Sequence, residues 1–105
     1  MKIKTNVVGT EYEIEIHNHA VTKTKTGMAG YFEATLPNGT KIKCIGIYDD
    51  AYADFEEGEC AQFCEQVYVD GTYVKCEEED GLRIEIGDGE SVRCEEIMGD
   101  ILKAI

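Results

Sequence analysis

Basic residues are scarce in this sequence. Its 105 residues include ten Lys and Arg against 22 Asp and Glu, which gives a formal net charge of −12 at pH 7. A chain this acidic repels phosphate backbones and anionic lipid headgroups. Direct binding to nucleic acid or to a membrane through a basic face is therefore not expected.

Long apolar stretches are also absent. No run approaches the ~18 residues needed to span a bilayer, and residues 1–18 alternate polar and apolar side chains, unlike a signal peptide. The cysteine count is five, an odd number, so at least one thiol stays free in a monomer. These features favour a reducing, cytoplasmic location in which the cysteines are thiols. The cysteines are Cys44, Cys60, Cys64, Cys76 and Cys94.

Proline occurs once, and 43% of the residues are hydrophobic, a composition that argues against disorder despite the charge. The length allows one domain, which we place at residues 1–105. The sequence contains no Gly-x-Ser-x-Gly motif, no phosphate-binding Gly-Lys-Ser/Thr loop and no dinucleotide fingerprint. Small antiparallel domains bind more often than they catalyse. We therefore expect a protein that is not an enzyme and carries no cofactor.

The first 48 residues alternate as antiparallel strands do. A two-residue loop at Gly9-Thr10 predicts a hairpin in which Ile3 faces Ile16, Thr5 faces Ile14 and Val7 faces Tyr12. The same register sets Lys4 against Glu15 and Lys2 against His17. A bulged three-residue turn at Pro37-Asn38-Gly39 predicts a second hairpin, with Phe32 opposite Cys44, Ala34 opposite Ile42 and Glu33 opposite Lys43.

The other elements complete a mainly β (α+β) domain. They are a strand at Ala20–Thr26 ended by Gly27–Gly30, a short helix or acidic loop at Asp49–Gly58, a helical stripe of Cys60, Phe63, Cys64 and Val67, a hairpin at Val67–Val74, and a strand at Leu82–Ile86. The tail at 90–105 carries Cys94, Ile97, Met98, Ile101, Leu102 and Ile105 on one helical face. A strand at Ser91–Glu95 followed by a shorter helix is the competing interpretation.

Metal binding was tested against the cysteine spacing. Cys60 and Cys64 could ligate one ion together with Cys76, Cys94 or the pair His17 and His19, which alternate on a strand and so share a face. No Cys-x-x-Cys pair occurs, however, and each cysteine falls at an apolar position, which favours core packing. An EF-hand frame that starts at Asp49 fails, because its third position is Ala51 and its sixth is Asp54. The prediction is that no metal is bound.

The acidic residues are unevenly distributed. Residues 1–48 hold six Lys and four Glu, a net charge of +2, whereas residues 49–105 hold four basic and 18 acidic residues, a net charge of −14. The acids gather in two clusters, and aromatic residues lie in the first. The predicted partner-binding residues are Asp49, Asp50, Tyr52, Asp54, Phe55, Glu56, Glu57 and Glu59 in the first cluster, and Glu77, Glu78, Glu79 and Asp80 in the second.

These clusters suggest a function. The sequence predicts a non-enzymatic acidic module that binds the basic surface of another protein. An inhibitor that occupies the groove of a nucleic-acid-handling protein, as mobile elements or phages encode, would fit. Homo-oligomers are compatible with it. The alternative is a domain that binds a metal or small ligand through its Cys and His residues, as an oligomer.

Overall fold

The computed structural model describes residues 1–49, 63–74 and 81–105, which form eight strands and one helix. The elements are β1 (Lys2–Val7), β2 (Thr10–Lys23), β3 (Gly27–Thr35), β4 (Lys41–Asp49), β5 (Phe63–Val69), β6 (Thr72–Val74), β7 (Arg83–Gly87), β8 (Glu90–Arg93) and α1 (Cys94–Ala104).

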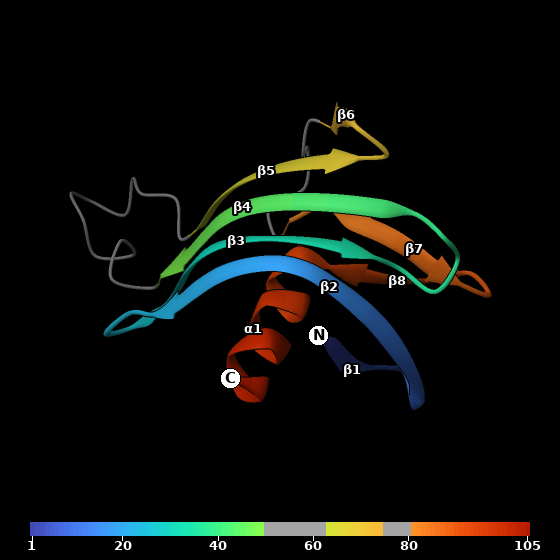
Figure 1. Ribbon diagram of the computed structural model, residues 1–105, viewed down its shortest axis with the longest axis horizontal. Helices are drawn as coiled ribbons and strands as arrows, with labels where there is room; N and C mark the ends of the chain where they lie inside the picture. Colours follow the sequence, from blue (N-terminus) through green and yellow to red (C-terminus); the bar gives the residue numbers. More distant parts are fainter. Residues whose placement is uncertain (50–62, 75–80) are drawn as a thin grey trace.

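Strands β1 to β6 form one antiparallel sheet in which every strand pairs with its neighbour in the chain. Strands β7 and β8 form a separate two-stranded sheet. The large sheet arches, and both α1 and the β7–β8 hairpin lie on its concave side (Figure 1). The predicted small, single, mainly antiparallel domain with a C-terminal helix is confirmed.

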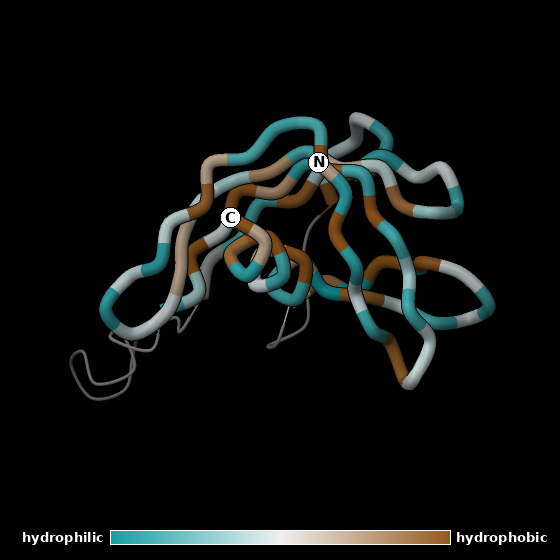
Figure 2. Tube along the Cα trace, turned by 60° about the horizontal axis from the view of Figure 1, so that its bottom comes forward, coloured by the Kyte–Doolittle hydropathy of each residue, from teal (hydrophilic) through white to brown (hydrophobic). Residues whose placement is uncertain are grey.

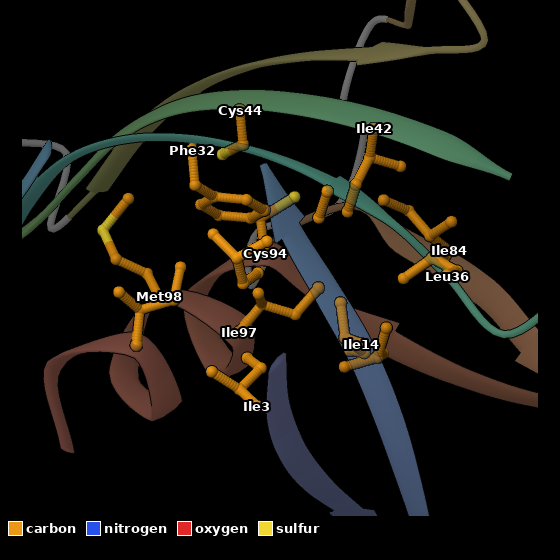
Figure 3. Packing of buried hydrophobic residues seen from close by; sticks show 14 of the residues in the cluster. Ile3, Ile14, Phe32, Leu36, Ile42, Cys44, Ile84, Cys94, Ile97 and Met98 are labelled. Carbon is orange, nitrogen blue, oxygen red and sulfur yellow. The ribbon is translucent and has the colours of Figure 1, made fainter. Parts of the chain in front are cut away.

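Buried and exposed residues alternate along the strands. Because successive side chains of a strand point to opposite faces, the buried apolar ones gather on the concave face of the sheet. Phe32 and Cys44 point from the sheet toward Cys94 and Ile97 of the helix (Figure 3). All four of these side chains are fully buried. Apolar segments of the sheet and of the C-terminal region line the inside of the arch (Figure 2). The core therefore lies between one sheet face and the last quarter of the chain.

Helix α1 begins directly after β8, as the competing interpretation of the tail proposed. The backbone N–H of Arg93 donates to Glu96 Oε1 at 2.9 Å, which satisfies one donor at the helix start. Ile97, Met98 and Ile101 are buried, whereas Ile105 lies past the helix end and is 64% exposed. Ile105 is thus not part of the apolar face predicted for it. Among the described residues, no helix has the length and apolar character needed to cross a bilayer.

The predicted register of the first hairpin is wrong by two residues. Ile3 faces Ile14 and Thr5 faces Tyr12, so the turn lies at Val8-Gly9 rather than Gly9-Thr10. Both turn residues have positive φ, 48° and 84°, as a two-residue type I′ turn requires. Gly9 adopts such an angle freely, whereas Val8 is a β-branched residue that the turn holds at an uncommon positive φ. A shift of two keeps the same residues on each face.

The ion pairs of this hairpin move with the register. Lys2 pairs with Glu13 at 3.5 Å and Lys4 pairs with Glu11 at 3.7 Å, in place of the predicted contacts with His17 and Glu15. All four side chains are more than half exposed, so each pair contributes little to stability. Their effect is to leave the outer face of β1 and β2 close to neutral.

Two other hairpins are confirmed. Phe32 faces Cys44, Ala34 faces Ile42 and Glu33 faces Lys43, as the bulged turn predicted. In the second, Val69 faces Thr72 across the Asp70-Gly71 turn. The Pro37-Asn38-Gly39 loop places Gly39 at φ 90°, in the left-handed region.

The break predicted at Gly27–Gly30 does not occur, because these residues open strand β3. The glycines allow two strand backbones to approach each other. A Cβ on Gly30 would lie 2.2 Å from the carbonyl oxygen of Ala20, and Gly30 has φ 152°. Glycine therefore acts here as a close-approach residue inside a strand rather than as a stop.

The helical stripe predicted around Phe63 is also wrong. Residues 63–69 form strand β5, paired with β4 through contacts such as Cys44 opposite Val67. Propensity over so short a window is weak, and pairing with the long strand β4 overrides it. Among the described residues α1 is the one helix. The short helix or loop predicted at Asp49–Gly58 lies, beyond Asp49, outside the described residues.

A glycine in a strand and a glycine in the helix give opposite predictions for substitution by alanine. Gly30→Ala should lower the free energy of unfolding by about 2–3 kcal/mol, because a Cβ meets the Ala20 carbonyl in a strained backbone. Gly99→Ala, in the interior of α1, should raise it by about 0.5–1 kcal/mol, since its nearest neighbour would be Met28 Cε at 3.8 Å. Urea denaturation of both variants measures the difference. Equal effects would contradict the distinction.

Candidate functional site

The carboxylate of Glu65, in β5, makes polar contacts with two other segments of the chain. The Tyr48 hydroxyl donates to Glu65 Oε1 at 2.5 Å, and the backbone N–H of Leu82 donates to Glu65 Oε2 at 2.9 Å. Tyr48 is the penultimate residue of β4, and Leu82 directly precedes β7. One carboxylate therefore joins the end of β4, the start of β5 and the entry to β7.

Tyr48 is well suited to donate to this carboxylate. Its side chain is 6% exposed, and its hydroxyl lies 3.7 Å from the Cys44 sulfur. Burial, reinforced by the Cys44 thiol and the Glu65 carboxylate, raises the pKa of Tyr48 well above the ordinary value. The phenol thus stays protonated. Its ring lies over Gly46, where a Cβ would come within 2.6 Å of the ring.

The contacts of Glu65 connect the flanks of both acidic clusters. The first cluster runs on from Asp49 and ends shortly before β5, whereas the second immediately precedes Gly81 and Leu82. Tyr48 faces Phe63 across the β4–β5 pair, and Glu65 reaches Leu82. The residues that flank the two clusters therefore lie together, although the clusters are separated in sequence by the β5–β6 hairpin.

Of the predicted partner-binding residues, Asp49 alone lies within the described residues. Its carboxylate accepts hydrogen bonds from the Thr24 hydroxyl at 2.8 Å and from the Thr26 hydroxyl. Asp49 thus fastens the turn between β2 and β3. Asp50, Tyr52, Asp54, Phe55, Glu56, Glu57, Glu59, Glu77, Glu78, Glu79 and Asp80 fall outside the described residues.

The two histidines do not share a face, contrary to the prediction. A bulge interrupts β2 between Ile16 and Asn18, so His17 lies on the outer face while His19 stands opposite Phe32. His17 Nε2 lies 2.7 Å from the Thr35 hydroxyl. One extra residue in the strand reverses the alternation, which sequence periodicity alone does not reveal.

The predicted core role is confirmed for Cys44 and Cys94, both fully buried. Cys60 and Cys76 lie outside the described residues, and Cys64 belongs to β5. Within residues 1–49, 63–74 and 81–105, no three His, Cys, Asp or Glu side chains gather as metal ligands would.

The outer face of the sheet carries a group of apolar side chains that sequence reasoning missed. Ile45 is 46% exposed, Ile47 is 41% exposed, and Tyr73 is 52% exposed. Tyr73 packs edge-on against Tyr68, with ring centroids 5.6 Å apart. The signal was the run from Ile42 to Tyr48, in which the outward positions at 45 and 47 are as apolar as the inward ones.

Two hollows adjoin on this outer face and share Ile45. The first, about 360 Å³, is lined by Lys41, Ile42, Lys43, Ile45, Tyr68 and Gly71. The second, about 420 Å³, is lined by Ile45, Gly46, Ile47, Glu65, Gln66 and Tyr73. Exposed aliphatic and tyrosine side chains beside shallow hollows are typical of protein-binding surfaces.

Comparison of the chain with protein families, with curated proteins and with solved structures gave no match.

A second contact between a tyrosine and a carboxylate, that of Tyr12 with Glu90, should be visible by titration. The hydrogen bond to Glu90 raises the pKa of Tyr12 from 10.0 to about 12, and burial and the nearby carboxylates add to the effect. The folded-state pKa is raised, so the stabilisation is complete below pH 10 and is lost as the pH rises toward 12. Tyr12→Phe should flatten the fall of the melting temperature over this range. An unchanged pH dependence would contradict the contact.

The Glu65 contacts predict a measurable coupling. Tyr48→Phe and Glu65→Gln should each lower the free energy of unfolding by about 1–2 kcal/mol, because the first removes one donor to the carboxylate and the second replaces one of its two acceptor oxygens by an NH2 group. The double variant should lose less than the sum, with a coupling of about 1 kcal/mol in urea denaturation. Tyr73→Phe, at an exposed tyrosine, is the matched control and should change stability by less than about 0.5 kcal/mol. Additive losses would show that the hydroxyl and the carboxylate are not coupled.

Proposed function

We propose that this protein is a non-enzymatic binding module that uses its two acidic clusters together against the basic surface of another protein. The observation that supports this is the contact of Glu65 with Tyr48 and Leu82, which holds the flanks of both clusters at one place. Residues 50–62 and 75–80 contribute nine of the 22 acidic residues and one lysine. Charges anchored at neighbouring points reinforce each other's field.

The charge pairing elsewhere supports the same proposal. Lysines of the first half pair with glutamates across the strands, as in Lys2–Glu13, Lys4–Glu11 and Lys43–Glu33. Residues 49–105 contain too few basic residues to neutralise their 18 acids in this way. The unbalanced negative charge therefore belongs to the second half, where it is available to attract a cationic partner.

A basic groove that binds nucleic acid is the kind of partner that fits best. Such a groove is lined by lysine and arginine, and a protein that carries closely spaced carboxylates competes with phosphates for it. Binding would then act by occlusion, without chemistry on the partner. Association would be accelerated by electrostatic steering and weakened by salt.

The test compares two variants of equal net charge. Glu77→Gln/Glu78→Gln/Glu79→Gln removes three charges from the second cluster, whereas the control Glu11→Gln/Glu13→Gln/Glu15→Gln removes three from the sheet. Each variant is immobilised and exposed to native lysate at low salt, and the retained basic proteins are quantified before and after a high-salt wash. The cluster variant should retain roughly tenfold less than wild type, and the control should retain nearly as much.

Equal losses in the two variants would contradict the proposal, because they would show that net charge matters and position does not. Retention that survives the salt wash would also contradict it, since an interface between acidic and basic surfaces weakens as ions screen it.

A further inference from the structure

Strand β4 buries one face and carries two neighbouring isoleucines on the other. Ile42, Cys44 and Tyr48 point into the core and are at most 6% exposed. On the opposite face Ile45 and Ile47 remain 46% and 41% exposed. A strand with one solvated face normally places polar residues there, whereas a strand covered on both sides is apolar throughout. The part of the outer face at Ile45 and Ile47 thus has the composition of a covered surface, between charged residues at the two ends of the strand.

The described elements cover only one of these faces. Helix α1 and the β7–β8 hairpin lie on the concave side of the arch (Figure 1). On the outer face Ile45 is exposed and lines both hollows, and Tyr73 is exposed and lines the second. Projecting side chains next to hollows of about 360 and 420 Å³ allow two such surfaces to interdigitate.

The charges along β4 indicate what covers this face. Its outward residues run Lys41, Lys43, Ile45, Ile47 and Asp49, from positive through apolar to negative. A two-fold axis near Ile45 that sets the β4 strands of two copies antiparallel places the lysine end of one strand over the aspartate end of the other. The pattern is therefore complementary to itself, as an isologous interface requires.

We propose that the outer face of β4, β5 and β6 is the interface between two copies of this chain. The sheets pack face to face about 10 Å apart, with Ile45 of each copy near the axis. Tyr68 and Tyr73 provide rigid aromatic surface at its side. Lys43 is already paired with Glu33 at 3.8 Å, so the centre of the face adds no net charge where the copies meet. This interface shares Asp49 with the first acidic cluster, but it does not depend on the proposed function.

The experiment is sedimentation velocity of the full chain from about 1 to 500 μM, a range suited to a weak symmetric dimer. At 150 mM NaCl the screening length is about 8 Å, so repulsion between distant acidic residues is largely removed. The wild-type mass should rise with concentration from 11.7 kDa toward twice that value.

Two substitutions locate the interface. Ile45→Lys should raise the dimer dissociation constant at least tenfold, because it sets two ammonium groups near the axis. Its matched control is Ile105→Lys, at an exposed isoleucine past the end of α1, which should leave the constant unchanged. Lys41→Glu should weaken the dimer several-fold, whereas Lys103→Glu, an equal charge change on α1, should not.

Circular dichroism melting verifies that each variant is folded, and if Ile45→Lys does not fold, Lys41→Glu carries the test alone. A wild-type chain that stays monomeric at 500 μM would overturn the proposal and assign the face to a different protein. A dimer whose dissociation constant is the same in wild type, Ile45→Lys and Lys41→Glu would overturn it as well, since the contact would then lie elsewhere. If the dimer interface and the acidic clusters act separately, a variant that no longer dimerises still captures basic proteins from lysate.

Discussion

The concave face of the six-stranded sheet is apolar across its width, and a sheet cannot bury such a face by itself. The cover comes from the last quarter of the chain. Its buried side chains are Cys94, Ile97, Met98 and Ile101 of α1, and Ile84, Ile86 and Val92 of the β7–β8 hairpin. The arch fits this cover, and the bulge at His17 and the close approach at Gly30 are devices that bend or tighten strands. The contact of Thr5 with Asp100 joins the first strand to the helix and so unites the ends of the chain.

The two halves of the sequence, the sheet and its cover, also differ in charge. The first half is a sheet whose outer lysines and glutamates pair across strands, so its net charge is close to zero. The second half supplies the inner cover, and nine of its 18 acidic residues belong to the segments 50–62 and 75–80. The carboxylate of Glu65 accepts hydrogen bonds from Tyr48 and Leu82. That single acid links the core to the flanks of both clusters.

The molecule thus offers two surfaces of different physical character. One is the proposed acidic surface of the two clusters, for which charge would govern encounter and salt would weaken binding. The other is the outer face around Ile45, where exposed aliphatic and tyrosine side chains border hollows. The first lies almost wholly beyond the described residues and could be found from composition. The second became apparent only once the strands were paired.

The sequence by itself determined the hairpins at Gly39 and Asp70-Gly71, because a turn residue and the alternation of side chains fix a register together. It also determined the burial of Cys44 and Cys94, since both stand at apolar positions. Only the tertiary structure decided that residues 63–69 are a strand, that Gly27 and Gly30 continue one, and that His17 and His19 lie on opposite faces. These outcomes depend on the partner strand alongside, whose backbone donors, acceptors and close contacts outweigh a local preference of a few tenths of a kcal/mol per residue.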